Sequence, residues 1–535
     1  MNNLVNRLCN SKSVQIALLV AVCLAVFGNS LSGGFVWDDN LFSANQVYWG
    51  YDLKTIFLGL ANGLEYQPVR DLTFLFDILV WRGSTFGFHL SNLLIFTAAT
   101  LLVMRLAERL CRRCLPDSAS SLIPFVTALI FAVHPLKSEV VAWVTQRNTL
   151  LATLFFLLAT LLFIRWQEEG GNRLLAYSCS VFLLAVFSKA TVVVLPLLLA
   201  FLLMTGKAEK KNWLALLPFL AVAALGAGLH LTIAGKSSVI SASYIGSFQE
   251  RIAVAMQIPF FYLKQTVFPA NISAFYVDDF SRSLSSPGPL LAALALVMLA
   301  GLVWLLRRKL PEVTIGFGWF IITLLPVSNL FATSPVVADR YLFLPSAGLA
   351  FMLAALLSRL FRTTSAHLAV CGVLLLPLSV MTVKQNKVWH DDITLWSATA
   401  KHSSGVAGVW FNLGRALHRT PQLSLALEAY LRAVKLNPAD IMALDNAASL
   451  FPSTRGSIRE RHPLVRSLAE QLPDYPAGLE QIGGVPLAWR YPDAAEELFL
   501  YLLAADPQSR HLRHALASFY RKMGAEDRAA AILQQ

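Results

Sequence analysis

Long apolar runs separated by short polar segments fill the first 384 residues of the chain. The runs 150–164 and 191–205 contain no charged residue, and a membrane-spanning helix needs about 20 mostly apolar residues. Eleven segments are therefore expected to be transmembrane helices: 14–31, 88–104, 121–136, 147–165, 174–188, 190–206, 213–233, 288–306, 313–330, 341–360 and 366–383. The first resembles a signal peptide, but its length favours a retained helix.

Charge placement predicts how these helices are oriented. The basic loops 105–120, 165–173, 207–212, 307–312 and 359–365 all fall on the same side of the membrane as the N-terminus. The positive-inside rule makes that side cytoplasmic, so an odd number of helices places the C-terminal domain in the periplasm of a bacterial cell. This orientation requires that 252–268, which contains Lys264, is a re-entrant or interfacial helix.

Composition agrees with a membrane protein. The 535 residues are 56% hydrophobic and 14% charged, whereas soluble domains carry roughly a quarter charged residues. The net charge of +12 would suggest nucleic acid as the partner of a soluble protein. Because the basic residues stand beside apolar runs, membrane orientation explains them and no nucleic acid is expected.

A repeat period defines the region after the membrane helices. A 34-residue window from Ala407 matches the tetratricopeptide (TPR) pattern at Trp410, Leu413, Gly414, Ala426, Tyr430, Ala433 and Pro438. Small residues at the eighth and twentieth positions allow the two helices of a repeat to touch. We predict a junction helix over 385–406 and a soluble TPR solenoid over 407–535, with repeats 407–440, 441–475 (degenerate), 476–509 and 510–535. Such arrays hold peptides or partner proteins on a concave surface.

Ionisable residues gather at the helix ends that are expected outside: Asp38, Asp39, His134, Glu139, Arg147, Lys189 and Arg340. Charges at a membrane face are costly and often functional, although interfacial anchoring and loop ion pairs are the alternatives. Cations such as Arg147, Lys189 and Arg340 suit a departing phosphate. A carboxylate at Asp38 or Asp39 suits proton removal from an attacking hydroxyl group.

Two weaker candidates lie on one predicted helix. His89 and Asn92 have the i, i+3 spacing that places both side chains on the same helix face. They could pack against another helix as readily as contact a substrate.

Several motifs, in chain order, resemble the transmembrane and TPR O-mannosyltransferase family and its bacterial relatives. They are 35–39, 66–73 with Arg70, 87–92, His134 with Glu139 and Arg147, 187–189, 339–346 and 389–396. The resemblance implies a GT-C-like fold of about 11 transmembrane helices, an acidic catalytic residue at Asp38 or Asp39, and an inverting transfer. Departures from the family pattern occur at Gln67 (usually Arg), at Asn148-Thr149 (usually ending in Asp) and at Ala190 (usually Glu).

The leading hypothesis is thus a glycosyltransferase. It would move a mannose-like sugar from a polyprenyl-phosphate carrier to hydroxyl groups of exported proteins, with the TPR domain engaging the acceptor or a partner protein. A divalent metal cofactor is left open. The alternatives are a membrane-anchored TPR scaffold without catalytic activity and a transporter or lipid flippase. Eleven helices exceed what an anchor needs, and the flippase would favour charges at mid-helix depth.

Overall fold

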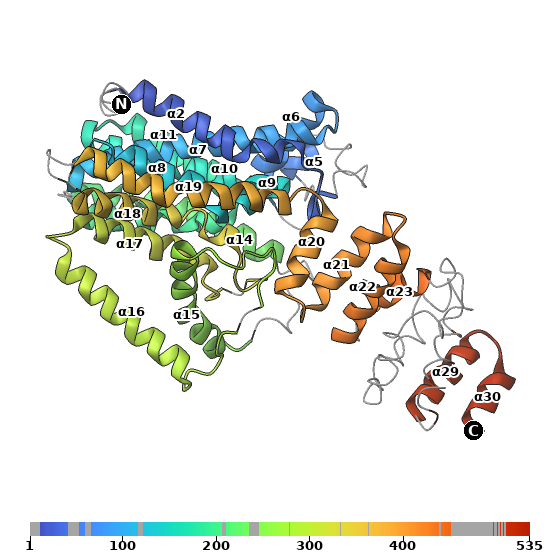
Figure 1. The fold of residues 1–535 in the computed structure, drawn as a ribbon. Helices are drawn as coiled ribbons and strands as arrows, with labels where there is room; N and C mark the ends of the chain where they lie inside the picture. The colour runs from blue at the N-terminus through green and yellow to red at the C-terminus, as the bar shows by residue number, and fades with distance from the viewer. Residues whose placement is uncertain are drawn as a thin grey trace. The chain divides into compact units, whose positions relative to one another are not determined.

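The computed structural model describes residues 11–40, 53–58, 66–115, 121–205, 210–234, 246–277, 279–331, 333–361, 363–437, 440–450, 496, 500, 503, 507 and 510–534. Regular structure in these ranges is helical, without strands (Figure 1). The chain divides into two compact units, Met1–Asp391 and Asp392–Gln535.

The first unit contains the apolar helices. Six stretches are long and apolar enough to cross a membrane: Lys12–Ser32, Thr85–Cys114, Val144–Glu169, Asn212–Leu229, Pro287–Leu306 and Thr364–Val388. A bent pair, Ile123–Val133 and Pro135–Ala142, is a seventh if it counts as one span. Shorter apolar helices cover Asn172–Ser188, Ala190–Thr205, Pro311–Val327 and Ser346–Leu360. Because all eleven predicted segments coincide with these helices, the all-α membrane bundle is confirmed and the chain is a multi-pass membrane protein.

Each of these stretches contains a main helix, and five of them include a short 3₁₀ turn. Their labels are α2 (Lys12–Phe27), α7 (Thr85–Cys114), α8 (Ile123–Val133), α9 (Ser138–Ala142), η4 (Val144–Gln146), α10 (Arg147–Glu169), α11 (Asn172–Ser188), η5 (Ala190–Val194), α12 (Leu195–Thr205), α14 (Leu217–Ala234), α16 (Pro287–Leu306), α17 (Pro311–Leu324), η7 (Leu325–Val327), α18 (Ser346–Leu360) and α19 (Thr364–Val388).

Two predicted boundaries are wrong, both at proline. The segment 121–136 does not continue as one helix, because α8 ends at Val133 and the chain bends by 63° before α9. The segment 341–360 begins too early, because α18 starts at Ser346. Pro135 and Pro345 disfavour helical conformation in the residue before them, so neither predicted helix continues through its proline.

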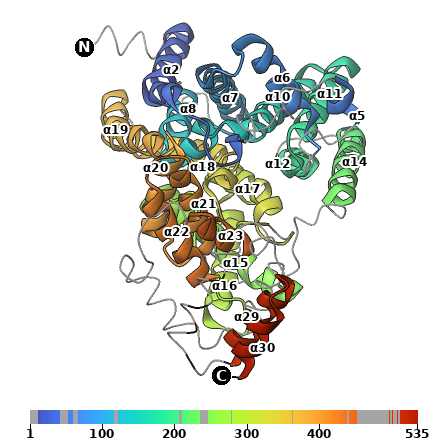
Figure 2. The same ribbon diagram turned by 90° about the vertical axis from the view of Figure 1, so that its right-hand side faces the viewer.

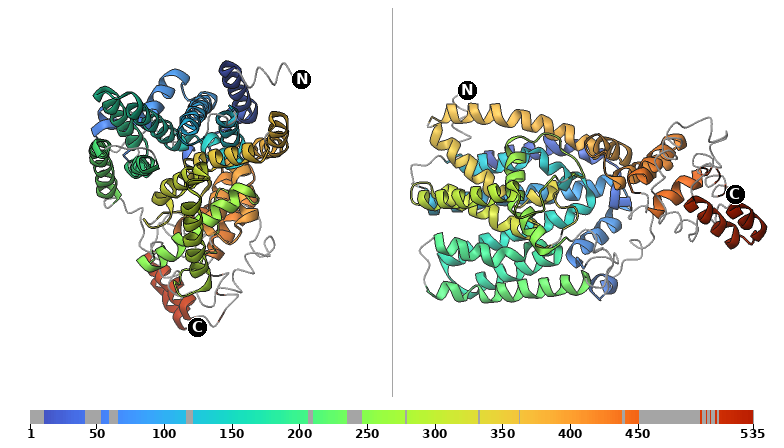
Figure 3. Two further views of the ribbon diagram at one scale, coloured as in Figure 1. Left: turned by 90° about the vertical axis from the view of Figure 1, so that its left-hand side faces the viewer. Right: turned by 90° about the horizontal axis from the view of Figure 1, so that it is seen from below.

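The centre of the first unit is formed by α7, α8, α10 and α18, which contribute to one hydrophobic core (Figure 2). The close approach of α17 and α18 depends on glycine. A Cβ atom on Gly316 would lie 2.5 Å from the carbonyl oxygen of Gly348. In contrast, α16 and α19 leave most of their span-length windows unburied, at 11% and 17% buried, and α19 lies along an edge of this unit (Figure 3). Exposed apolar faces of this kind suit contact with lipid.

Outside the spans, the first unit also contains α5 (Leu53–Leu58), α6 (Pro68–Trp81), α15 (Phe248–Val267) and the 3₁₀ turns η2 (Trp37–Asp39) and η8 (Asp339–Leu342). Three short elements belong to or overlap the stretches given above: η1 (Gly28–Ser32), η3 (Pro135–Lys137) and α13 (Lys210–Leu214). The helix α15 covers the predicted interfacial segment and is not among the helices apolar enough to span. Its position in the membrane stays a prediction, as does the orientation of the bundle.

The second unit contains α20 (Asp392–His402), α21 (Ala407–His418), α22 (Leu423–Leu436), α23 (Ile441–Leu450), α29 (Arg510–Lys522) and α30 (Glu526–Gln534). At Gly414 a Cβ atom would lie 2.6 Å from the ring of Tyr430, which is the close helix contact expected within a repeat. Pro438 and most of 451–509 lie outside the described residues. The four-repeat assignment and the junction at 385–406 therefore stay predictions.

Candidate functional site

The segment 34–39, which ends in the turn η2, is held by contacts from three other parts of the chain. The backbone N–H of Gly34 donates to the carbonyl oxygen of His390 over 2.8 Å, and His89 Nε2 lies 3.3 Å from the carbonyl oxygen of Gly34. Trp37 has φ +53°, which is strained for a residue other than glycine. Its ring stacks on Trp143 with centroids 4.6 Å apart and planes 5° apart, a contact that stabilises this conformation.

The two neighbouring acids of η2 have opposite environments. Asp39 is 0% exposed and accepts hydrogen bonds from the N–H groups of Val36, Val144 and Thr145 and from the Thr145 hydroxyl. Burial raises the pKa of Asp39 to about 7, against these hydrogen bonds, which favour the ionised form. The Asp38 side chain is exposed. Asp39 thus ties η2 to η4, while Asp38 is accessible to a substrate.

Arg147 lies in a fully buried network at the start of α10. Its guanidinium pairs with Asp77 of α6 at 2.6 Å, and its Nε donates to Asn92 Oδ1 over 2.8 Å. Asn92 Nδ2 in turn lies 3.3 Å from the carbonyl oxygen of Trp143, in the loop before η4. Arg147 and Asp77 are 0% and 1% exposed, so this pair links α6, α7 and α10 and offers a substrate no surface.

Arg340 begins a second network, around η8. Glu139 of α9 pairs with the Arg340 side chain and accepts from its backbone N–H over 2.8 Å. The Tyr276 hydroxyl donates to Asp339 over 2.6 Å. Burial, with the nearby Glu139 carboxylate, raises the pKa of Asp339 well above its ordinary value. The Arg340 guanidinium carbon also lies 5.6 Å from the centre of the Trp143 ring, so Trp143 contacts both the η2 turn and η8.

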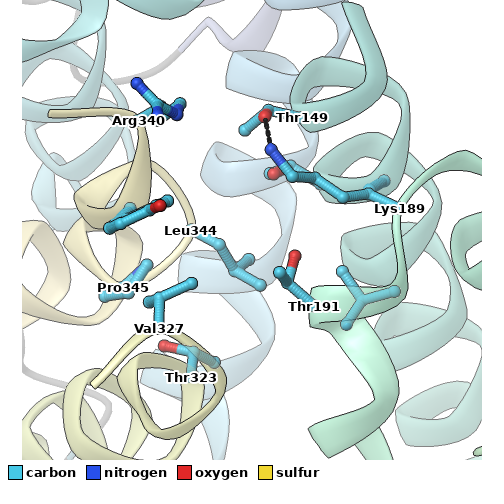
Figure 4. Close-up of a pocket in the computed structure, with 12 residues that line it drawn as sticks. Thr149, Lys189, Thr191, Thr323, Val327, Arg340, Leu344 and Pro345 are labelled. Atoms are coloured by element: carbon cyan, nitrogen blue, oxygen red, sulfur yellow. Dashed lines mark hydrogen bonds between the residues drawn. The ribbon is translucent and has the colours of Figure 1, made fainter. Parts of the chain in front are cut away.

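A small cavity of about 30 Å³ brings the α10, η5, α17 and η8 regions together. Its polar lining comprises Thr149, Thr153, Lys189, Thr191, Thr323, Arg340 and Tyr341, and its apolar lining includes Val192, Val327 and Leu344. Lys189 Nζ donates to Thr149 Oγ1 over 2.8 Å and lies 3.5 Å from Gln146 Oε1. Figure 4 shows Lys189 and Arg340 on opposite sides of the cavity. Two of the three predicted phosphate-binding cations thus share one site, and Arg147 does not line it.

The remaining candidates are placed away from this cavity. His134 lies with Nε2 3.0 Å from the carbonyl oxygen of Thr266, which connects the break after α8 to the end of α15. Arg70 is buried and pairs with Asp71 at 2.8 Å. Among the described residues, no three His, Cys, Asp or Glu side chains are grouped to hold a metal ion.

Sequence reasoning missed three residues of these networks. Asp77, the partner of Arg147, could have been noticed as a lone acid in an otherwise apolar stretch of α6. Thr145 and Tyr276 carry no such signal, because hydroxyl groups in loops are common and their partners are far away in sequence.

No family model matches the chain. Protein O-mannosyl-transferase F38B6.6 of Caenorhabditis elegans is 24% identical over 457 residues, which cover 79% of this chain and 63% of that protein. Protein O-mannosyl-transferase TMTC1 of Homo sapiens is 27% identical over 520 residues, covering 82% and 57%. Protein O-mannosyl-transferase TMTC3 of Mus musculus is 25% identical over 516 residues, covering 86% and 55%.

The chain thus spans 55–63% of the length of these relatives. The similarity extends over about four fifths of the chain itself. These matches confirm the resemblance of the chain to the transmembrane and tetratricopeptide-repeat O-mannosyltransferase family.

Proposed function

We propose that the chain is a GT-C membrane glycosyltransferase that moves a mannose-like sugar from a polyprenyl-phosphate carrier to hydroxyl groups of exported proteins. The names of the similar proteins support protein O-mannosyl transfer. The observation that carries the proposal is the cavity lined by Lys189 and Arg340 from opposite sides. The repeats of the C-terminal unit would engage the acceptor or a partner protein.

The lining of the cavity suits a lipid phosphate. Lys189 and Arg340 supply positive charge and N–H donors for phosphate oxygens, and Thr149 holds the ammonium group of Lys189 in place. Val192, Val327 and Leu344 supply an apolar wall for the first isoprene units. Because the open volume is only about 30 Å³, room for about two water molecules, binding must shift lining side chains.

Asp38 is the better candidate for the catalytic base, since it is exposed while both oxygens of Asp39 are engaged. Asp38 would take the proton from the acceptor hydroxyl group as its oxygen attacks the anomeric carbon. The bond from that carbon to the phosphate oxygen breaks, and the phosphate leaves with the bonding electron pair. Lys189 and Arg340 stabilise the negative charge that develops on it. Attack from the side opposite the phosphate inverts the anomeric centre.

The other candidates act as positioning residues in this proposal. Asp39 and His89 hold the η2 turn that carries Asp38. Asn92 and Arg147 hold the loop before η4. Glu139 holds Arg340 through both its side chain and its backbone.

The test is Asp38→Asn in the full-length purified protein, assayed for transfer of labelled mannose from polyprenyl phosphate to an acceptor peptide. General-base catalysis contributes roughly 10²–10⁴-fold, so the rate should fall by at least about 100-fold. The matched control is Asp279→Asn, an exposed acid of the loop after α15, which should leave the rate unchanged. Undiminished transfer by the Asp38 variant would remove this residue from the mechanism. Partner binding without any transfer by the wild type would favour the scaffold.

A further inference from the structure

A second and larger hollow, of about 330 Å³, lies near the other end of α10. Thr149 and Thr153, near the start of this helix, line the first cavity, whereas Leu161, Leu162 and Arg165 line the second. At 1.5 Å per residue, Arg165 lies roughly 24 Å from Thr149 along the helix axis. The second hollow is therefore separate from the proposed catalytic site.

Positive charge exceeds negative charge around this hollow. Its lining contains five cations (Lys12, Arg105, Arg109, Arg112 and Arg165) and one acid, Glu108. Glu108 is shared by three of them, since it pairs with Lys12, with Arg105 at 3.1 Å and with Arg112 at 2.8 Å. Arg109 pairs with Glu168, and Arg165 with Glu169. One carboxylate cannot neutralise three cations, so the group retains charge for an anion.

The depths of these residues along their helices point to a lipid. Lys12 is the first residue of α2, Arg105 and Arg112 lie in the last turns of α7, and Arg165 lies in the last turns of α10. Leu161 and Leu162 line the same hollow one turn further into α10. Cations at the helix ends stand at the level of lipid head groups, and the leucines stand at the level where acyl chains begin.

We infer that this hollow binds the phosphodiester head group of an anionic phospholipid. Arginine side chains match phosphate oxygens in charge and in the geometry of their N–H groups. A soluble phosphate would satisfy the same cations but would not cover the partly exposed Leu161 and Leu162. The lipid site would stabilise the packing of α2, α7 and α10 at this end of the bundle, independently of sugar transfer.

The experiment uses the full-length protein in detergent and native mass spectrometry with phosphatidylglycerol or phosphatidylcholine. The test variant is R105Q/R112Q; both side chains are partly exposed, at 46% and 62%, so the fold should persist, and an unchanged unfolding temperature checks this. The matched control is R308Q/K309Q, which removes the same charge from exposed residues after α16 that do not line the hollow.

The wild type and the control should bind phosphatidylglycerol roughly tenfold more tightly than phosphatidylcholine, and the test variant should lose that preference. Equal phosphatidylglycerol binding by wild type and test variant would overturn the inference. An equal loss in the control would also overturn it, because general surface charge would then explain the binding. Displacement of phosphatidylglycerol by millimolar glycerol 1-phosphate would overturn it as well, since the site would then recognise a soluble anion.

Discussion

Asp38 and Asp39 are adjacent in the chain, yet their asparagine variants are expected to fail for different reasons. In Asp39→Asn the new amide group must replace a carboxylate whose two oxygens both accept hydrogen bonds. One oxygen faces the N–H and hydroxyl of Thr145 at 2.7 and 2.5 Å, and the other faces the N–H groups of Val144 and Val36 at 3.1 and 3.4 Å. Whichever way the amide turns, its NH₂ group meets at least one backbone N–H.

The size of the stability loss in Asp39→Asn follows from that geometry. A buried N–H group that loses its acceptor costs about 1–3 kcal/mol, so Asp39→Asn should lower the free energy of unfolding by about that amount. The variant should also lose transfer activity, because η2 would no longer be held against η4. Asp38→Asn changes an exposed side chain, and such substitutions usually change stability by less than about 0.5 kcal/mol.

Thermal unfolding of both purified variants, measured beside transfer rates, separates the two roles. Asp39→Asn should unfold at a lower temperature than wild type, whereas Asp38→Asn should unfold at the wild-type temperature and transfer sugar at least about 100-fold more slowly. If Asp39→Asn is as stable as wild type, the four hydrogen bonds do not hold the turn and the division of roles is refuted.

Three further substitutions test neighbouring parts of the structure. Lys189→Met should weaken binding of the polyprenyl-phosphate donor by roughly tenfold or more, because one charge-assisted hydrogen bond to the phosphate is lost. A titration with the donor measures the affinity, and the unfolding temperature should stay unchanged. Asp77→Asn leaves the buried charge of Arg147 without its acid and should destabilise the protein by about 3–5 kcal/mol, measured by denaturant or thermal unfolding. Gly414→Val forces side-chain atoms into the ring of Tyr430, and such overpacking should destabilise the unit 392–535 by about 1–3 kcal/mol. Faster cleavage of this unit in limited proteolysis measures the loss.

The membrane helices could be predicted because the requirement that defines them is local. A span needs a run of apolar residues, and the sequence displays each run directly. The predicted helix boundaries are wrong where proline interrupts an apolar run, as at Pro135 and Pro345. The sequence also identified Lys189 and Arg340 as charges at helix ends, because both stand beside long apolar runs.

The ion pairs and hydrogen bonds between distant side chains could not be predicted in the same way. Arg147 is equivalent to Lys189 and Arg340 in the sequence, and like Arg340 it pairs with an acid in the fold. Unlike Arg340, it is fully buried and does not line the cavity. The choice between Asp38 and Asp39 also depends on a distant element, since three of the four hydrogen bonds to Asp39 come from Val144 and Thr145. Contacts over such separations depend on how helices pack, and a single sequence does not specify this packing.

The departures from the family pattern are neighbours in space, which changes how they should be interpreted. Asn148 Nδ2 donates to Gln67 Oε1 over 3.1 Å, Thr149 lies 3.1 Å from Asn148 Oδ1, and Lys189 donates to Thr149 over 2.8 Å. The basic residue of the family pattern at position 67 and the acidic residue at position 149 are thus both replaced by uncharged polar residues. These residues form a chain of hydrogen bonds from Gln67 through Asn148 and Thr149 to Lys189. Loss of the acid at 149 therefore does not leave its surroundings unsatisfied. It removes negative charge beside Lys189, and a phosphate in the cavity would then experience a stronger attraction from that lysine.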